Sequence, residues 1–245
     1  MTPIEVVNRV LGGCGIAVCS VGELVLNYYN VPRAIYELEF CVSRGYLVLA
    51  AAKLCLSGNF EPCDPEPTIN NYTEYKRGFP RLRTTFLPDR QQTIIIFTAH
   101  VYGLEPLAEK TLTIRAPDCH VSKEMDGFNA EEMAAMTLPR LAPYLRGQAA
   151  KFLSTRDDVA MIAVEELIDG MDLDEGWVSD QLQDFAVIPR AVNAMVPYAG
   201  SLTRSHQPDR RRAAPMSALS LTRPVIYGMV FGQGMTDCQS ALQLI

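Results

Sequence analysis

The sequence predicts an α+β fold that is mainly helical and contains a small, mostly antiparallel β-sheet. We place the sheet at about residues 84–115 and regard residues 225–231 as a candidate additional strand. Three observations support this prediction. Capping signals mark helix starts, one run of β-branched residues is typical of a buried strand, and two long proline-containing stretches interrupt the regular segments.

The first residues predict a helix with a defined start. Thr2-Pro3-Ile4-Glu5 combines a capping box with proline at the first helical position. Apolar residues then recur at helical spacing until Gly12-Gly13, where the helix is expected to end. Residues 16–29 are apolar, and their pattern fits a strand or a helix equally well.

Two further helices are expected before the first irregular stretch. Residues 33–43 carry an apolar stripe at helical spacing that includes Leu38 and Cys41. Residues 46–57 carry another stripe, and Gly58 follows at the position where glycine commonly ends a helix. Residues 59–80 contain several prolines and predict a long irregular segment. Such segments are commonly functional or packed against a neighbour.

Residues 93–102 form the clearest predicted strand, because the run is β-branched and apolar on both faces. Residues 111–114 are its expected antiparallel partner, and residues 84–86 are a candidate third strand. His100 lies near the end of this run and is expected to be a buried, hydrogen-bonded core residue.

Helices are expected again after Asn129-Ala130-Glu131-Glu132, which forms a second capping box. The later helical segments are residues 131–136, 139–153, 157–168 and 177–185. Residues 199–216 predict a second irregular segment, and a last helix is expected from about Thr236. We expect residues 1–245 to form a single domain.

Charge and cysteine content restrict the class of protein. The net charge is −6, so broad coating of nucleic acid is not expected, because that binding needs a basic surface. The seven cysteines are odd in number and lie mostly in apolar segments, which indicates buried thiols in a reducing compartment. A cytoplasmic location, or a virion if the protein is viral, is therefore expected. The apolar segment Tyr46–Leu56 is too short to span a membrane and contains Lys53, so no membrane span is expected.

Residues with catalytic potential do not form a known motif. The triad-like group Asp118-Cys119-His120 places neighbouring side chains on opposite faces of an extended segment. The cysteines match no zinc-binding spacing. Gly12-Gly13-Cys14-Gly15 and Gly232-Gln233-Gly234 lack the other residues of a phosphate-binding loop. We therefore predict no catalytic, cofactor-binding or metal-binding residue, and no cofactor.

Two oppositely charged tracts are the most distinctive features. Residues 156–184 carry a net charge of −9, and residues 204–223 carry a net charge of +4. A solvated surface explains each tract alone, but together they could meet between subunits and set the register of an assembly. The candidate subunit contacts are Arg204, Arg210, Arg211, Arg212, Asp169, Asp172, Asp174 and Glu175.

These observations favour a structural, self-assembling protein, such as a viral coat or minor capsid subunit, that acts through protein–protein contacts. Self-association, or membership of a larger protein assembly, is the expected partnership. The first alternative is an enzyme whose active site is built from scattered residues, with the candidates Asp118, Cys119, His120, Glu166 and Asp169. The second alternative is a regulatory adaptor that uses the proline-rich loop or the arginine-rich loop.

Overall fold

The structure is a computed structural model, and it describes residues 2–63, 72–87, 91–114, 125 and 128–182. By backbone contacts the chain divides into residues 1–197 and residues 198–245, and every described residue belongs to the first unit. The predicted irregular segment 199–216, the candidate strand 225–231 and the last predicted helix lie outside the described residues.

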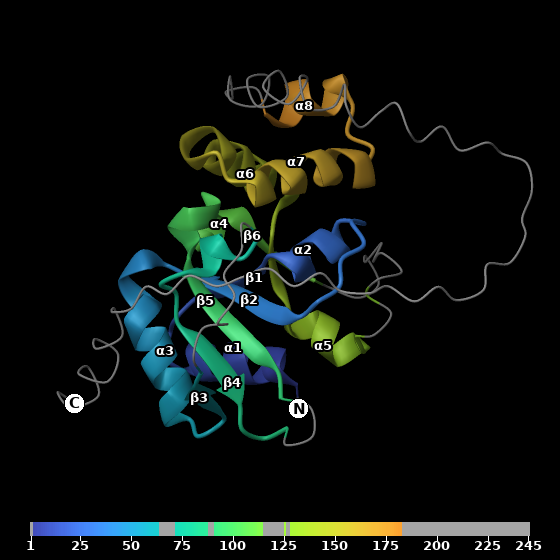
Figure 1. The fold of residues 1–245 in the computed structure, drawn as a ribbon. Coiled ribbons are helices and arrows are strands. Elements are labelled where there is room, and N and C mark those ends of the chain that lie inside the picture. The colour runs from blue at the N-terminus through green and yellow to red at the C-terminus, as the bar shows by residue number, and fades with distance from the viewer. Residues whose placement is uncertain (1, 64–71, 88–90, 115–124, 126–127, 183–245) are drawn as a thin grey trace, which may run out of the picture. The chain divides into compact units, whose positions relative to one another are not determined.

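The described residues form an α+β structure, as the sequence predicts (Figure 1). The α-helices are α1 (Pro3–Gly13), α2 (Glu23–Tyr28), α3 (Leu47–Leu56), α4 (Leu107–Lys110), α5 (Ala130–Ala135), α6 (Leu141–Thr155), α7 (Asp158–Gly170) and α8 (Glu175–Gln181). The strands are β1 (Val18–Val21), β2 (Glu37–Val42), β3 (Phe60–Pro62), β4 (Arg81–Thr84), β5 (Thr93–Thr98), β6 (Thr111–Thr113) and β7 (Thr137–Pro139). Short 3-10 helices are η1 (Arg44–Tyr46), η2 (Glu74–Lys76) and η3 (Ala99–Tyr102).

The main sheet has five strands in the order β1-β2-β5-β4-β3. The pairs β1–β2, β5–β4 and β4–β3 are antiparallel, but the central pair β2–β5 is parallel, so the sheet is mixed. Strands β6 and β7 form a separate antiparallel pair. Two strands of the main sheet, β1 and β2, come from residues before position 43, well outside the predicted range of 84–115.

The predicted helix at residues 33–43 is wrong, because residues Glu37–Val42 form strand β2. The apolar spacing of this segment fits a helix only if Glu37 and Glu39 lie on the solvent side of that helix, and in the structure both are buried. All six residues of β2 are buried, so both of its faces are covered, and its two edges pair with β1 and β5.

The other corrections concern residues 59–114. The stretch 59–80 is less irregular than predicted, since it contains β3 and η2. The predicted strand 93–102 ends at Thr98, and its expected antiparallel partner at 111–114 pairs instead with β7. His100 is exposed in η3 rather than buried in a strand.

Both predicted capping boxes are confirmed. The backbone N–H of Glu5 donates to Thr2 Oγ1, and the Thr2 N–H donates to the Glu5 carboxylate over 2.7 Å. Asn129 and Glu132 exchange the equivalent bonds at the start of α5. These contacts involve neighbours in sequence, and therefore the sequence alone identifies them.

The core around β5 explains why this run is apolar on both sides. Residues 94–97 are fully buried, and the Phe97 ring packs against the rings of Tyr75, Phe79 and Tyr102. Helices α1 and α3 pack together, as do α6 and α7. Within the described ranges, no helix combines the length and apolarity needed to cross a bilayer.

Candidate functional site

Two glutamates of β2 are buried side by side on one face of the sheet. Alternate residues of a strand point to the same side, so Glu37 and Glu39 share a face while Leu38 and Phe40 face the opposite core. The exposed fractions of Glu37 and Glu39 are only 9% and 1%. A buried carboxylate is stable only when it is paired or accepts hydrogen bonds, so both side chains need partners from elsewhere in the chain.

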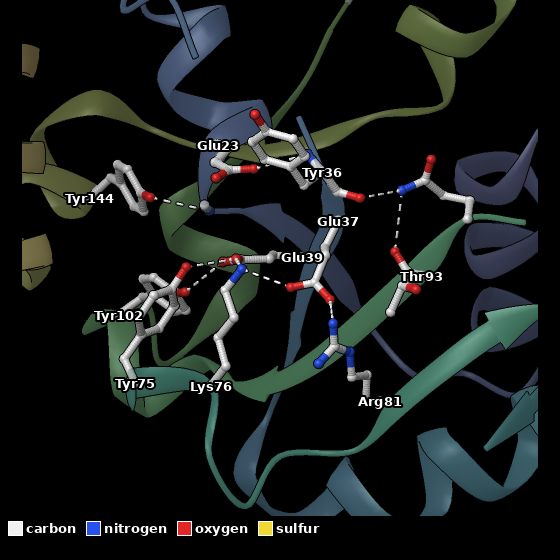
Figure 2. A network of polar contacts seen from close by, with 12 residues as sticks. Glu23, Tyr36, Glu37, Glu39, Tyr75, Lys76, Arg81, Thr93, Tyr102 and Tyr144 are labelled. Carbon is white, nitrogen blue, oxygen red and sulfur yellow. Dashed lines mark hydrogen bonds and ion pairs between the residues drawn. The ribbon is translucent and has the colours of Figure 1, made fainter. Parts of the chain in front are cut away.

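Cationic partners come from η2 and β4 (Figure 2). The Lys76 Nζ atom lies 2.9 Å from Glu37 Oε2 and 2.9 Å from Glu39 Oε1, so one ammonium group bridges the two carboxylates. Arg81 reaches across β5, which separates β4 from β2, and pairs with the other oxygen of Glu37. Two carboxylates therefore face two cations.

Two phenols complete the shell around Glu39. The Tyr75 hydroxyl donates to Glu39 Oε1 over 2.7 Å, and the Tyr102 hydroxyl donates to Oε2 over 3.2 Å. Burial, followed by the negative charge of Glu39, raises the pKa of both phenols well above the ordinary value. Burial also lowers the pKa of Lys76, but its attraction to Glu39 and its hydrogen bonds to both glutamates outweigh this effect, and the net pKa is raised. All three groups are therefore held in their donor forms at neutral pH.

The turn between β1 and α2 closes over Glu39 from the other side. Gly22 has a φ of +69°, and a Cβ atom there would lie 2.2 Å from Glu39 Oε2. The Gly22 N–H donates to the Tyr144 hydroxyl over 3.2 Å, and the Tyr144 ring stacks on Tyr102 with 6.0 Å between ring centres. Glycine is required here both by the backbone conformation and by the close approach of the carboxylate.

A third carboxylate, that of Glu23, lies at the edge of this cluster. Burial is the largest influence on the pKa of Glu23 and raises it. The N–H of Tyr36 donates to Glu23 over 3.3 Å and lowers the pKa, whereas the charges of Glu39 and Glu37 raise it. The net pKa of Glu23 is raised, so this group responds to the charge state of the buried pair.

Helix α6 adds two further polar side chains beside the phenols. The Lys151 Nζ atom pairs with Asp157 at 2.6 Å and lies 4.6 Å from the centre of the Tyr75 ring. Gln148 is 5% exposed, and its Oε1 atom has no hydrogen-bond partner in the described part of the chain. Since Tyr144, Gln148 and Lys151 are spaced four and three residues apart, they share one face of α6.

The acidic residues predicted as subunit contacts lie at the end of α7 and the start of α8. Asp169, Asp172 and Asp174 are exposed. The Asp174 carboxylate caps α8 by accepting from the Trp177 N–H over 2.7 Å, and Glu175 is the first residue of that helix. Their predicted partners Arg204, Arg210, Arg211 and Arg212 lie outside the described residues, so the proposed complementarity stays a prediction.

Of the candidate catalytic residues named from the sequence, the structure describes Glu166 and Asp169, which both lie in α7. Asp118, Cys119 and His120 lie outside the described residues, and Glu166 pairs with Arg33 at 2.5 Å. Over the described ranges, no group of three or more His, Cys, Asp or Glu side chains is arranged to hold a metal ion. Two of the seven cysteines, Cys19 and Cys41, are buried opposite each other on β1 and β2.

Sequence reasoning missed the Glu37–Glu39 network. The signal is the acid–apolar alternation of Glu37-Leu38-Glu39-Phe40, which would have identified a strand with both acids on one face. Comparison of the chain with protein-family models and with curated protein sequences finds no match. The functional argument therefore depends on the geometry of this network.

Proposed function

We propose that this chain is an enzyme of the metal-assisted phosphoryl-transfer class, in which Glu37 and Glu39 hold a divalent cation on a phosphate-bearing substrate. The observation that carries the proposal is the position of the Lys76 ammonium, 2.9 Å from one oxygen of each carboxylate. That position is where a cation shared by two carboxylates would lie. Mg²⁺ is commonly held by one or two protein carboxylates, with substrate phosphates and water as the remaining ligands, so a third protein ligand is not required.

The charges of the network support an exchange of partners. If a divalent cation takes the place of the Lys76 ammonium between the carboxylates, Lys76 loses both carboxylate partners, and Arg81 lies beside the same site at the other oxygen of Glu37. Both side chains can then pair with phosphate oxygens, and arginine is well suited to this because its guanidinium makes two parallel bonds. A cation and a phosphate group entering together therefore leave every charge compensated, whereas either one alone does not.

A purely structural ion network is the competing explanation, and it makes the opposite prediction for Lys76. In a structural network, removing Lys76 takes one cation away from both buried carboxylates and weakens the fold without creating a binding site. In the proposed site, the lysine competes with the metal for the carboxylates. Replacing it should therefore strengthen binding of the cation alone and weaken binding of the cation with a nucleotide.

The test is Mn²⁺ binding to the full chain, followed by electron paramagnetic resonance, with and without ATP. We expect ATP to strengthen Mn²⁺ binding by the wild type, and Glu37→Gln to weaken it by at least about tenfold, equivalent to the loss of one charged ligand. Lys76→Met should bind Mn²⁺ alone more tightly than the wild type. Glu61→Gln is the matched control, because Glu61 pairs with Arg83 on the same sheet but is exposed. Equal Mn²⁺ binding by the wild type and Glu37→Gln would refute the proposal.

Self-association is the second candidate function, and one observation favours it. Helix α3 exposes large apolar side chains, including Val48 at 64% and Leu56 at 65% exposure. Exposed apolar surface of this kind commonly marks a protein contact. The more specific role of a viral coat or minor capsid subunit stays a prediction. Electron microscopy of the purified chain would test it, since defined particles support that role and a monomer at every concentration excludes it.

A further inference from the structure

Tyr36 lies directly before the buried carboxylates of β2, and its side chain is unusually exposed. At 78%, it has the highest exposed fraction of any large apolar side chain in the part of the chain that the structure describes. Tyr36 and Glu37 are consecutive, so their Cα atoms are about 3.8 Å apart. An aromatic ring is therefore available to a ligand at the edge of the Glu37–Glu39 network.

The main chain of Tyr36 is held on both sides. Its N–H donates to Glu23 Oε2 over 3.3 Å, and its carbonyl oxygen accepts from Gln92 Nε2 over 3.1 Å. Tyr36 precedes β2 and is exposed, so its ring is not directed into the core behind Glu37. Figure 2 shows the ring on the side of the network where Glu23 lies. The anchored main chain keeps the exposed ring beside the proposed cation site.

The Gln92 side chain presents a hydrogen-bond acceptor at the same place. Its Nε2 atom donates to the carbonyl oxygens of Tyr36 and Thr93, over 3.1 and 3.4 Å. Because both neighbours are acceptors, the nitrogen of the carboxamide must face them, and the oxygen is directed away. Gln92 Oε1 is therefore an acceptor of fixed orientation, and its amide group is bonded to the main chain of Tyr36.

An exposed aromatic ring and an oriented amide oxygen together suit a nucleobase. Stacking on an aromatic side chain stabilises every base, because every base has a π face. An amide oxygen accepts a hydrogen bond from an exocyclic amino group, such as that of adenine, but not from the carbonyl oxygen that replaces it in hypoxanthine. The pair therefore selects a base that carries an amino group.

We propose that the phosphate-bearing substrate of the cation site is a nucleotide whose base carries an amino group, with the base stacked on Tyr36 and the amino group donating to Gln92 Oε1. The inference rests on the proposed function, because it takes the phosphates to be held beside Glu37. Since Tyr36 and Glu37 are neighbours, the base and the phosphates of one small molecule reach both positions. The competing explanation is that Tyr36 is a solvated surface residue, since single exposed apolar residues are common.

The test is isothermal titration calorimetry on the full chain with the Mg²⁺ complexes of ATP, ITP and inorganic tripolyphosphate. Tripolyphosphate offers the phosphates alone, and ITP differs from ATP in carrying a carbonyl oxygen in place of the amino group. We expect the wild type to bind ATP at least about fivefold more tightly than tripolyphosphate, because stacking of one base on an aromatic ring strengthens binding by about five- to 150-fold. ATP should also bind about fivefold more tightly than ITP, which loses one hydrogen bond.

Single variants locate the effect at Tyr36 and Gln92. Tyr36→Ala should weaken ATP binding at least about fivefold and leave tripolyphosphate binding unchanged, whereas Tyr36→Phe keeps the stacking surface and should bind ATP as the wild type does. Gln92→Leu should bind ATP and ITP equally, because it has no acceptor for the amino group. Tyr46→Ala is the matched control, since Tyr46 is also exposed but lies in η1, beyond the other end of β2.

The outcomes separate this inference from the cation site. If tripolyphosphate binds and Glu37→Gln weakens its binding, but ATP binds no more tightly than tripolyphosphate, the cation site stands and the nucleotide assignment is wrong. An equal loss of ATP and tripolyphosphate binding in Tyr36→Ala would also overturn the assignment, since a structural role of Tyr36 affects both ligands alike. If none of the three complexes binds to the wild type, the proposed function is wrong, and this inference with it.

Discussion

Replacing Gly22 by alanine tests whether the turn between β1 and α2 holds Glu39 in place. The new Cβ would lie 2.2 Å from Glu39 Oε2, so the carboxylate must move by more than about 1 Å to restore an ordinary contact distance. That movement breaks the hydrogen bond from Tyr102 and lengthens those from Tyr75 and Lys76. The main chain at Gly22 adds strain, because its φ of +69° and ψ of −142° are favourable only for glycine.

The two costs can be estimated separately. Backbone strain of this kind costs about 1–3 kcal/mol. Disrupting a buried charged network costs about 3–5 kcal/mol. Since the two costs have separate causes, we add their lower bounds and expect a combined loss of at least about 4 kcal/mol, which lowers the melting temperature by about 8–16 °C in a chain of this size.

The assay is thermal and urea unfolding, followed by circular dichroism, with Gly12→Ala as the matched control. Gly12 lies in α1, is exposed, and has nothing within 4 Å of an added Cβ, so its replacement should leave stability unchanged or raise it slightly. The double variant Gly22→Ala/Glu39→Ala should lose less stability than the sum of the single variants, because the clash is gone. A melting temperature for Gly22→Ala equal to that of Gly12→Ala would refute the described packing of Glu39.

Two further predictions concern single side chains. The pKa of Glu23 is raised above its ordinary value of 4.5, so the folded state binds its proton more tightly, and this favours folding at low pH and opposes it as the pH rises through the folded pKa. Relative to the wild type, Glu23→Gln should therefore raise the free energy of unfolding in urea more at pH 7 than at pH 4. A larger increase at pH 4 would contradict the direction of the pKa shift. Leu54→Ala should cost about 2–5 kcal/mol because Leu54 is fully buried, whereas Leu56→Ala should change the stability of the monomer by less than about 0.5 kcal/mol. Urea unfolding at low protein concentration measures both variants, and equal losses would show that the two faces of α3 are assigned incorrectly.

Segments whose signals are local were predicted from the sequence. The capping boxes at Thr2 and Asn129 use partners three residues away; α1 starts at Pro3 as predicted, and α5 starts at Ala130, one residue before its predicted start. Helices α3 and α7 also lie within a few residues of their predicted bounds, because each shows an apolar stripe and ends at or just before a glycine. The run in β5 was identified as a strand covered on both faces because β-branched residues fill it.

The candidate site could not be predicted in the same way. The partners of Glu37 are Lys76 and Arg81, which are 39 and 44 residues away in sequence. Without those partners in view, the apolar stripe of residues 33–43 predicts a helix, and nothing local indicates that the two glutamates are buried. The subunit contacts predicted at Asp169, Asp172, Asp174 and Glu175 stay a prediction, since their proposed arginine partners lie outside the described residues.

The sequence by itself determined the α+β class, the capped starts of α1 and α5, and the buried character of β5, since each depends on neighbouring residues or on periodicity. Only the tertiary structure decided that β2 is a strand, that it pairs in parallel with β5, and that its glutamates are buried. The physical reason is that a carboxylate enters a protein interior only when distant cations and phenols compensate its charge. Lys76, Arg81, Tyr75 and Tyr102 do so here, and only folding brings them to β2.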